Sequence, residues 1–385
     1  MLNKKTRFCF VTILFWFAVY AYVPQMPGYA RQLGASYKMI GLITGAYGLT
    51  QTLLRIPLGI GSDMLGKRKI FIVIGSGVAT LSALIVYLIP SPLTLLVARL
   101  LAGVSAATWV TFTVMYASYY PPLQATKAIG IIQSMNRIGM FTAMLVGGYL
   151  STRFDIPAIF ILSSVVGMLA MVASLSLEES SGLKNKRGFQ KTDIPALLRN
   201  KNVMTICVLG AMSQMIMYGT TLGFTPIVAG LLGATNFQLS LLTMTFIFPQ
   251  IIISLLSGTL FLRLFGERNT LLIGFTLMTI ACLMTPLAPS LTLLFVLQLF
   301  SGIGNGIAFP LLTGLVIRDV AEYLRNTTMG FFQAFFGLGM ILGPIILGFV
   351  SETWSLSYGF WTIGLIGIGS LIFLSRHSFN QAAQS

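Results

Sequence analysis

The sequence predicts an all-α integral membrane protein made of two related halves with six transmembrane helices each. Apolar residues make up 56% of the 385 residues and charged residues only 9%, and the mean hydropathy is +0.87. A water-soluble protein of this length needs far more charge on its surface. Two further observations, a series of long apolar runs and an internal repeat, give the number and the grouping of the helices.

The apolar runs are each close to the roughly 20 residues that cross a bilayer as a helix. Inside lipid such runs have to be helical, because the hydrocarbon offers no hydrogen-bond partner to backbone groups. Six fall in each half of the chain. In order, they lie near residues 8–28, 40–61, 70–90, 93–118, 128–150, 157–177, 202–227, 239–262, 270–288, 292–317, 327–350 and 356–375.

Residues 127–160 and 327–360 are two copies of one segment. The start of each half matches as well, since Pro27 aligns with Pro226 and Gly34 with Gly233. Duplication inside so apolar a sequence is typical of membrane transporters built from repeats. At an offset of 200 positions the matching residues are Gly130, Gln133, Gly139, Gly148, Ser151 and Phe160 with Gly330, Gln333, Gly339, Gly348, Ser351 and Phe360.

The longest polar loop separates the two halves. We therefore expect an N-terminal six-helix bundle over residues 1–178, a cytoplasmic linker over 179–200 and a C-terminal six-helix bundle over 201–385. With both termini in the cytoplasm, most of the 24 Lys and Arg residues fall in cytoplasmic segments. The net charge of +15 thus indicates membrane topology and contact with anionic lipid, and it does not indicate nucleic-acid binding.

A glycine-rich basic turn follows the second run, from Gly59 through Asp63 and Gly66 to Lys69. Gly59 would let a neighbouring helix approach, and Gly66 would make the tight turn. Asp63 would face a helix N-terminus or a basic side chain. The spacing resembles the signature loop of the major facilitator superfamily, although Met64 stands where that family usually has Arg.

The resemblance implies the fold of that superfamily, twelve transmembrane helices in two pseudo-symmetric six-helix bundles with both termini cytoplasmic. It also implies a secondary transporter that works by alternating access. The signature loop has an echo in the second half at Gly266-Glu267-Arg268. On this basis Asp63, Gly59, Gly66 and Arg68 are candidates for coupling or gating.

Two further stretches resemble the drug:proton antiporter branch of the superfamily. In the fourth run Arg99 precedes Gly103 by four residues, as in the fourth-helix motif of that branch. The end of its fifth-helix motif is kept at residues 147–150, but its Gly-Pro pair is replaced by Ala143-Met144 and is found at Gly343-Pro344 instead. This resemblance implies export of a small amphiphilic compound, a drug or a metabolite, by exchange with protons.

Three arginines lie inside predicted spans, whereas none of the nine acidic residues does. Each such Arg costs about 2.5–3.5 kcal/mol at a helix centre. Arg55 either braces the signature loop or extends toward the cytoplasm. Arg99 matches a motif that the family associates with proton coupling. Arg137 lies near the middle of its span and either faces substrate or supports helix packing.

The candidate substrate cavity combines Arg137 with other polar and aromatic residues of the predicted inner helices. Each of these residues can equally serve helix packing, and together they suit an amphiphilic ligand. In the first half they are Tyr22, Gln25, Gln51, Trp109, Thr113, Gln133 and Asn136, and in the second half they are Gln214, Tyr218, Asn305 and Gln333.

No nucleophile triad, metal-ligand cluster or nucleotide motif is present, so we expect a transporter without cofactor or metal and not an enzyme. The expected partners are a small-molecule substrate, protons and membrane lipids, with the chain acting as a monomer in the cell membrane. An alternative keeps the fold but moves an organic anion, a phosphorylated metabolite or a lipid head group past the arginines. A membrane sensor that does not transport is the remaining alternative.

Overall fold

The computed structural model describes residues 3–121, 124–179, 199–318, 320 and 325–376. The regular structure in these ranges is helical throughout, which confirms the predicted all-α fold. Ten helical segments of the described chain are long and apolar enough to cross a membrane. A multi-pass membrane protein is therefore supported, while twelve spans and the side on which the termini lie remain predictions.

The chain divides into two compact units that nearly follow the two sequence halves. Unit 1 comprises Met1–Ala35, Ala46–Arg187 and Ala234–Leu241, and unit 2 comprises Ser36–Gly45, Gly188–Gly233 and Leu242–Ser385. Each unit thus includes a short segment from the other half of the sequence. The two exchanged segments are repeat equivalents, because each contains the start of the second long helix of its half.

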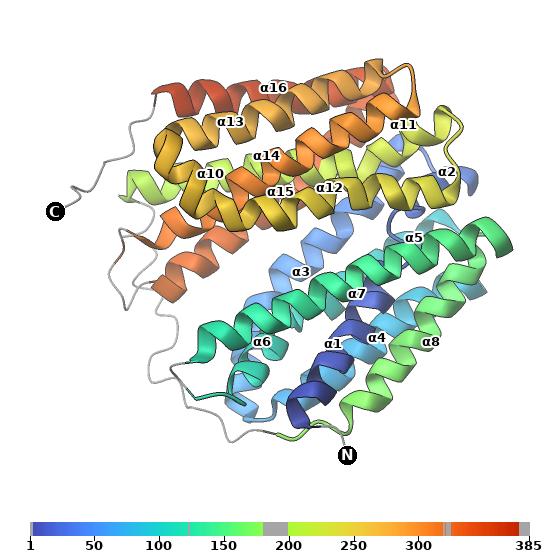
Figure 1. Ribbon diagram of the computed structural model, residues 1–385. Coiled ribbons are helices and arrows are strands. Elements are labelled where there is room, and N and C mark those ends of the chain that lie inside the picture. Colours follow the sequence, from blue (N-terminus) through green and yellow to red (C-terminus); the bar gives the residue numbers. More distant parts are fainter. Residues whose placement is uncertain (1–2, 122–123, 180–198, 319, 321–324, 377–385) are drawn as a thin grey trace. The chain divides into compact units, whose positions relative to one another are not determined.

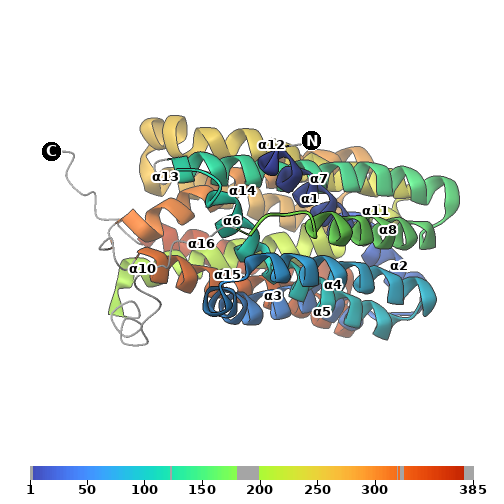
Figure 2. The same ribbon diagram turned by 90° about the horizontal axis from the view of Figure 1, so that it is seen from below.

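In unit 1, α4 packs against α5 and α8, and α1 packs against α7 and α8 (Figures 1 and 2). Phe8, Phe15 and Phe112 are fully buried in this unit. The helices of the first half are α1 (Lys4–Tyr20), α2 (Met26–Gln32), α3 (Tyr37–Leu65), α4 (Arg68–Leu88), α5 (Pro92–Ala107), α6 (Trp109–Ala117), α7 (Ala125–Phe154) and α8 (Pro157–Ser174).

In unit 2, α13 packs against α14 and α16, and α10 packs against α15 (Figure 1). Phe275, Leu312, Phe332 and Leu374 belong to its buried core. The helices of the second half are α10 (Lys201–Ile216), η3 (Met217–Phe224), α11 (Thr225–Leu231), α12 (Asn236–Leu256), η4 (Ser257–Phe261), α13 (Leu262–Met284), η5 (Thr285–Leu287), α14 (Leu291–Arg318), α15 (Arg325–Thr353) and α16 (Leu356–Arg376).

Several of the predicted runs are not single regular α-helices, among them those at 8–28, 93–118 and 202–227. The run at 8–28 is divided into α1 and α2 by turn residues around Pro24, which has no backbone N–H to continue the helix. The run at 93–118 is divided at Thr108, whose hydroxyl donates to the carbonyl of Ser105 over 2.7 Å. Such back-bonding bends helices. The run at 202–227 contains the π-helical turn η3, which includes Gly219 and Gly223.

The repeat is visible in the backbone. Gly34 and Gly233 have φ angles of 86° and 81°, and Gly66 and Gly266 have φ angles of 61° and 71°. Only glycine adopts this left-handed conformation without a steric cost. The paired glycines therefore place the same turns at the same points of the two halves.

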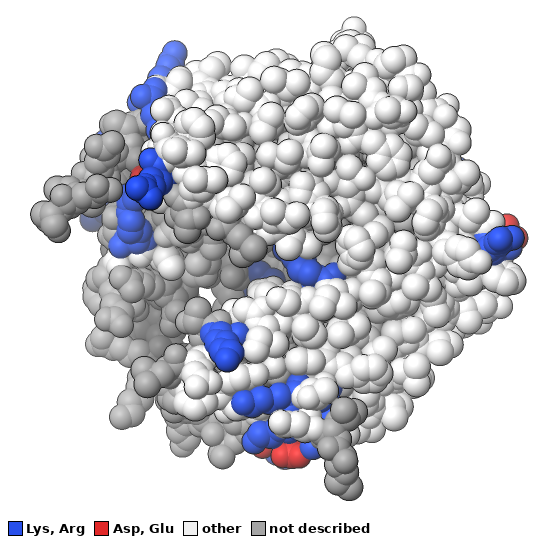
Figure 3. Space-filling model, in the orientation of Figure 1, with Lys and Arg blue, Asp and Glu red and all other residues white. Residues whose placement is uncertain are grey.

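The described surface is mostly uncharged. Figure 3 shows Lys and Arg side chains gathered at one end of the helices, with one group near the middle of the view and a smaller one at the opposite end. Large apolar side chains such as Leu53, Leu93, Val172 and Phe349 are exposed. Exposed apolar side chains over most of a helical protein are what a lipid environment requires.

Candidate functional site

The candidate residues of α7 do not share one environment. Arg137 and Gln133, one helical turn apart, are exposed, whereas Asn136 is only 7% exposed and Met140 is buried as well. Arg137 therefore does not lie in the unit 1 interior. The structure places Asn136 there instead.

Arg99 is the most deeply buried guanidinium among the described residues of unit 1. It lies on α5, is 4% exposed, and stacks over the ring of Tyr47 on α3 with its Cζ 4.5 Å from the ring centroid. Its Nε and Nη1 atoms are buried and have no hydrogen-bond partner among the described residues. An aromatic face attracts a guanidinium, but it does not satisfy N–H donors.

The helices α3 and α5 approach closely one turn beyond Arg99. Thr50 donates to the carbonyl of Leu100 over 2.7 Å. A Cβ atom on Gly103 would overlap the hydroxyl of Thr50 and the carbonyl oxygen of Tyr47, and would lie 3.1 Å from the backbone nitrogen of Gln51. Gln51 is 9% exposed, and its Oε1 has no hydrogen-bond partner in the described chain. Arg99 and Gln51 therefore belong to facing turns of two tightly packed helices.

The aromatic candidates of unit 1 are part of its packing. Trp109 begins α6 and meets Trp16 of α1 edge-on at 5.2 Å between ring centroids. Tyr22 is buried, contacts the ring of Phe160 at 5.0 Å and shares a hydrogen bond of 3.3 Å with Ser82. Thr113 is half-buried and donates to the carbonyl of Val110 within its own helix.

Gln25 joins two segments of unit 1. Its Nε2 donates to the carbonyl of Asn236 over 2.9 Å and to the hydroxyl of Ser240 over 2.8 Å. Its side chain is 1% exposed. Asn236 in turn donates to the carbonyl of Ser151 over 3.1 Å. Gln25 thus holds the exchanged segment of α12 inside unit 1.

Unit 2 contains a closed polar network. Asn305 of α14 is fully buried, donates to Ser213 of α10 over 3.2 Å, and accepts a hydrogen bond from Gln250 of α12. Of the other candidates, Gln214 and Tyr218 are buried, and Gln333 is half-buried.

The signature loop lies between α3 and α4. Asp63 belongs to α3, but its side chain lies outside the described part of the structure. A Cβ on Gly59 would meet Val110 of α6 at an ordinary 3.6 Å. Gly66 makes the turn with its positive φ, and Arg55 is half-buried on α3.

Two glutamates beside the predicted linker have structural roles that sequence reasoning did not assign. Glu179 accepts hydrogen bonds from the backbone N–H groups of Arg68 over 2.7 Å and of Lys69 over 3.1 Å, so its carboxylate caps the start of α4. A negative charge at a helix N-terminus is favourable. The signal that could have found it is the acidic pair Glu178-Glu179 directly after an apolar run.

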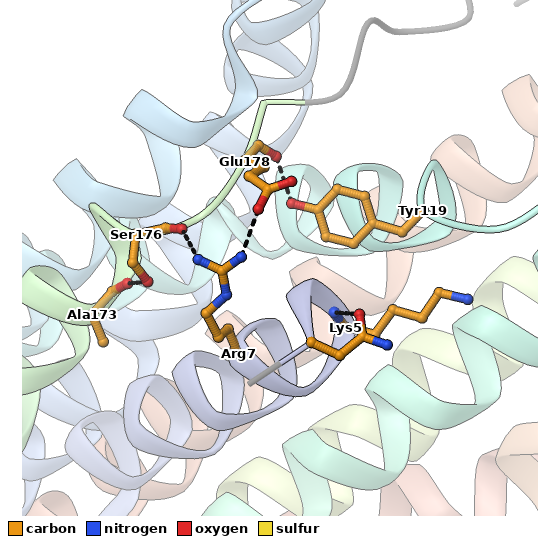
Figure 4. A network of polar contacts seen from close by, with 7 residues as sticks. Lys5, Arg7, Tyr119, Ala173, Ser176 and Glu178 are labelled. Atoms are coloured by element: carbon orange, nitrogen blue, oxygen red, sulfur yellow. Dashed lines mark hydrogen bonds and ion pairs between the residues drawn. The ribbon is translucent and has the colours of Figure 1, made fainter. Parts of the chain in front are cut away.

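Glu178 anchors a network at the same end of unit 1 (Figure 4). Arg7 of α1 forms an ion pair with Glu178 at 2.5 Å and donates to the carbonyl of Ser176 over 3.0 Å. Tyr119 donates to the carbonyl of Glu178 over 2.5 Å. Burial, together with the nearby carboxylates of Glu178 and Glu179, raises the pKa of Tyr119 to about 12.

The echo of the signature loop in unit 2 uses different partners. Glu267 forms an ion pair with Arg318 at the end of α14. Arg268 donates to the carbonyls of Leu374 and Ser375 at the end of α16. Both glycine turns thus lie beside charged groups that fix helix ends.

The described residues contain no group of three or more His, Cys, Asp or Glu side chains placed to hold a metal ion. The candidate polar side chains that lie buried are amides, hydroxyls and the guanidinium of Arg99. Such groups bind and orient a ligand but offer no nucleophile with an adjacent base.

Comparisons with known proteins agree with this arrangement. The sequence profile of the Major Facilitator Superfamily matches residues 8–231 and 206–384. An uncharacterized MFS-type transporter of Methanocaldococcus jannaschii is 28% identical over 365 residues, which cover 91% of this chain and 92% of that protein. The quinolone resistance protein NorA of Staphylococcus aureus is 30% identical over 154 residues, 40% of this chain and 39% of NorA.

Solved structures show the same fold. The nucleoside transporter NupG superposes with a TM-score of 0.78 at 18% identity, covering 98% of this chain and 100% of the NupG chain. A bacterial homologue of the human lysosomal transporter Spinster superposes with a TM-score of 0.78 at 16% identity, covering 96% and 95% of the two chains. With matches to its profile over both halves, the chain belongs to the Major Facilitator Superfamily and is a membrane transporter rather than an enzyme.

Proposed function

We propose that this transporter exports small amphiphilic compounds by alternating access, in exchange for protons. The observation that carries the proposal is the segment from Arg99 to Gly103. Its spacing resembles the fourth-helix motif of the drug:proton antiporters, and it is buried against α3 in unit 1. The similarity to a quinolone resistance protein over 154 residues supports a drug-like substrate.

The chemistry of the buried candidates fits this substrate class. In both units they are mostly apolar, aromatic or neutral polar side chains, with few charges. A site that is apolar apart from a few polar anchors selects amphiphilic ligands. Proton exchange requires a titratable group, and the sequence offers no carboxylate in the middle of a span, so the proton is carried by an acid near a helix end or by the substrate.

The test uses the full chain reconstituted in proteoliposomes that contain a pH-sensitive dye. When an amphiphilic fluorescent substrate such as ethidium is added, it should cross the membrane of the proteoliposomes. Protons should move across the membrane in the opposite direction, which the pH-sensitive dye reports. Empty liposomes are the control. Substrate movement with a flat pH trace would overturn proton exchange, and absence of movement for cationic, neutral and anionic amphiphiles alike would overturn the export proposal.

A further inference from the structure

The repeat makes it possible to compare Arg99 with an equivalent position in the same chain. Arg99 and Gln298 lie 199 residues apart, as do Gln51 and Gln250, and Gly103 and Gly302. The local packing is also equivalent. A Cβ on Gly302 would overlap the carbonyl oxygen of Phe246, just as one on Gly103 would overlap that of Tyr47.

At these equivalent positions each amide of unit 2 donates a hydrogen bond, while the Oε1 atom of Gln298 is buried without a partner among the described residues. Gln298 is 2% exposed and its Nε2 donates to Thr225 over 3.5 Å. Gln250 donates to Asn305. A neutral amide therefore fills the place of the arginine in unit 2, and the fold does not require a charge there.

In unit 1 the difference lies in the donors, because the Nε and Nη1 atoms of Arg99 have no acceptor among the described residues. Ala106 stands at the position equivalent to Asn305, so Gln51 has no asparagine to meet. The Gln51 Oε1 atom and two nitrogens of the Arg99 guanidinium are left without hydrogen-bond partners in the described structure. Buried polar groups without partners are rare and are costly, and a bound ligand can satisfy them.

Acidic residues are scarce in the part of the sequence that contains Arg99. Asp63 is the only acidic residue among the first 154 residues. It lies on α3, sixteen positions after the Tyr47 that contacts Arg99, which is about 24 Å along a helix. The helical turn that carries Asp63 is thus remote along α3 from the Tyr47 turn that packs on Arg99.

We infer that Arg99, with Tyr47 and Gln51, forms a binding site for the carboxylate of an amphiphilic organic anion. The guanidinium supplies charged N–H donors, and the Tyr47 ring holds it in place. The amide of Gln51 supplies a further polar group one turn away on the same helix. This inference rests on the proposed function and names amphiphiles that carry a carboxylate as a preferred group within its substrate class.

The experiment measures binding rather than transport, using the purified full chain in detergent and titration calorimetry. The probes are 2-naphthoate, the neutral 2-naphthamide and the cationic 2-naphthylmethylammonium, which share one ring system and differ in charge. We expect the naphthoate to bind at least tenfold more tightly than the naphthamide.

The central variant is Arg99→Gln, which places in unit 1 the residue that unit 2 already has. It should weaken naphthoate binding at least tenfold and leave naphthamide binding within twofold. Arg153→Gln removes a positive charge from an exposed position in the last turn of α7, and it should change neither affinity. If Arg99→Gln does not fold, Arg99→Lys keeps the charge, changes its geometry, and should still prefer naphthoate over naphthamide.

The possible failures can be told apart. If the wild-type protein binds naphthoate and naphthamide equally, or if Arg99→Gln binds naphthoate as the wild type does, the carboxylate site is refuted while export of amphiphiles stands. A loss of naphthoate preference in Arg99→Lys together with normal binding in Arg99→Gln would also refute it. If no probe of any charge binds, both the site and the proposed function fail.

Discussion

Gly339 of α15 provides a quantitative test of how the helices of unit 2 pack. A Cβ at this position would overlap the carbonyl oxygen of Ala211 on α10 and would lie 2.9 Å from its carbonyl carbon and 3.1 Å from its Cα. All three are backbone atoms, so no side-chain rotation can relieve the contact. The variant Gly339→Ala therefore has to push α15 away from α10.

Overpacking of this kind costs about 1–3 kcal/mol. Alanine also stabilises a helix relative to glycine, by up to about 1 kcal/mol. The matched control is Gly330→Ala in the same helix, because a Cβ on Gly330 meets nothing within 4 Å. The difference between the two variants isolates the cost of the contact.

The measurement is thermal unfolding of the purified protein in detergent. A change of 1 kcal/mol shifts the midpoint by roughly 2–4 °C for a cooperative unit of this size. Gly339→Ala should therefore melt roughly 2–12 °C below Gly330→Ala. The pair Gly139→Ala and Gly130→Ala should behave the same way in unit 1, where a Cβ on Gly139 would lie 2.6 Å from the carbonyl oxygen of Ile13. Equal midpoints for Gly339→Ala and Gly330→Ala would refute the reasoning.

Three further predictions concern polar contacts. Gln25→Leu should lower the free energy of unfolding by about 1–3 kcal/mol in thermal unfolding, because it leaves two buried acceptors without their donor; an unchanged midpoint would contradict this. Tyr119→Phe should have a lower free energy of unfolding than wild type at pH 8, measured by denaturant unfolding. The difference in unfolding free energy between the two proteins should become smaller between pH 10 and 12. In this pH range the raised pKa keeps Tyr119 protonated in the folded protein, while the same side chain ionises in the unfolded chain. Ionisation therefore stabilises the unfolded state of the wild type but not that of the Phe variant, which has no phenol group. A difference in unfolding free energy that increases over this range would refute the prediction. Arg7→Gln should lower the free energy of unfolding by less than about 1 kcal/mol, since the exposed ion pair with Glu178 is screened by water. A larger decrease, measured by thermal unfolding, would contradict this expectation.

Much of the fold could be predicted because lipid constrains it so strongly. Apolar runs have to be helices, and some of the duplicated glycines mark helix contacts and turns. Gly139 and Gly339 both lie against a backbone carbonyl of a neighbouring helix, and Gly66 and Gly266 both adopt positive φ. What apolar periodicity cannot predict is where a helix breaks. Pro24 and Thr108 interrupt runs that read as continuous, because the break depends on backbone hydrogen bonds.

The site was less predictable for a physical reason. The sequence places polar residues inside spans but does not give the side of the helix that is buried. Arg137 and Arg99 both lie inside predicted spans, but the structure exposes Arg137 and buries Arg99 against Tyr47. Glu179 lies in the predicted linker. Its contact with the start of α4 depends on the packing of α8 against α4, which the sequence alone does not show.

The exchange of short segments between the two units has a consequence for how such a chain could arise. Residues 36–45 belong to the unit of the second half, and residues 234–241 to that of the first. A half-length ancestor with this fold would lack part of its own unit and could complete it only by pairing with a second copy, as in a domain-swapped homodimer. Fusion of two such copies would make the pairing intramolecular and free it from dependence on protein concentration.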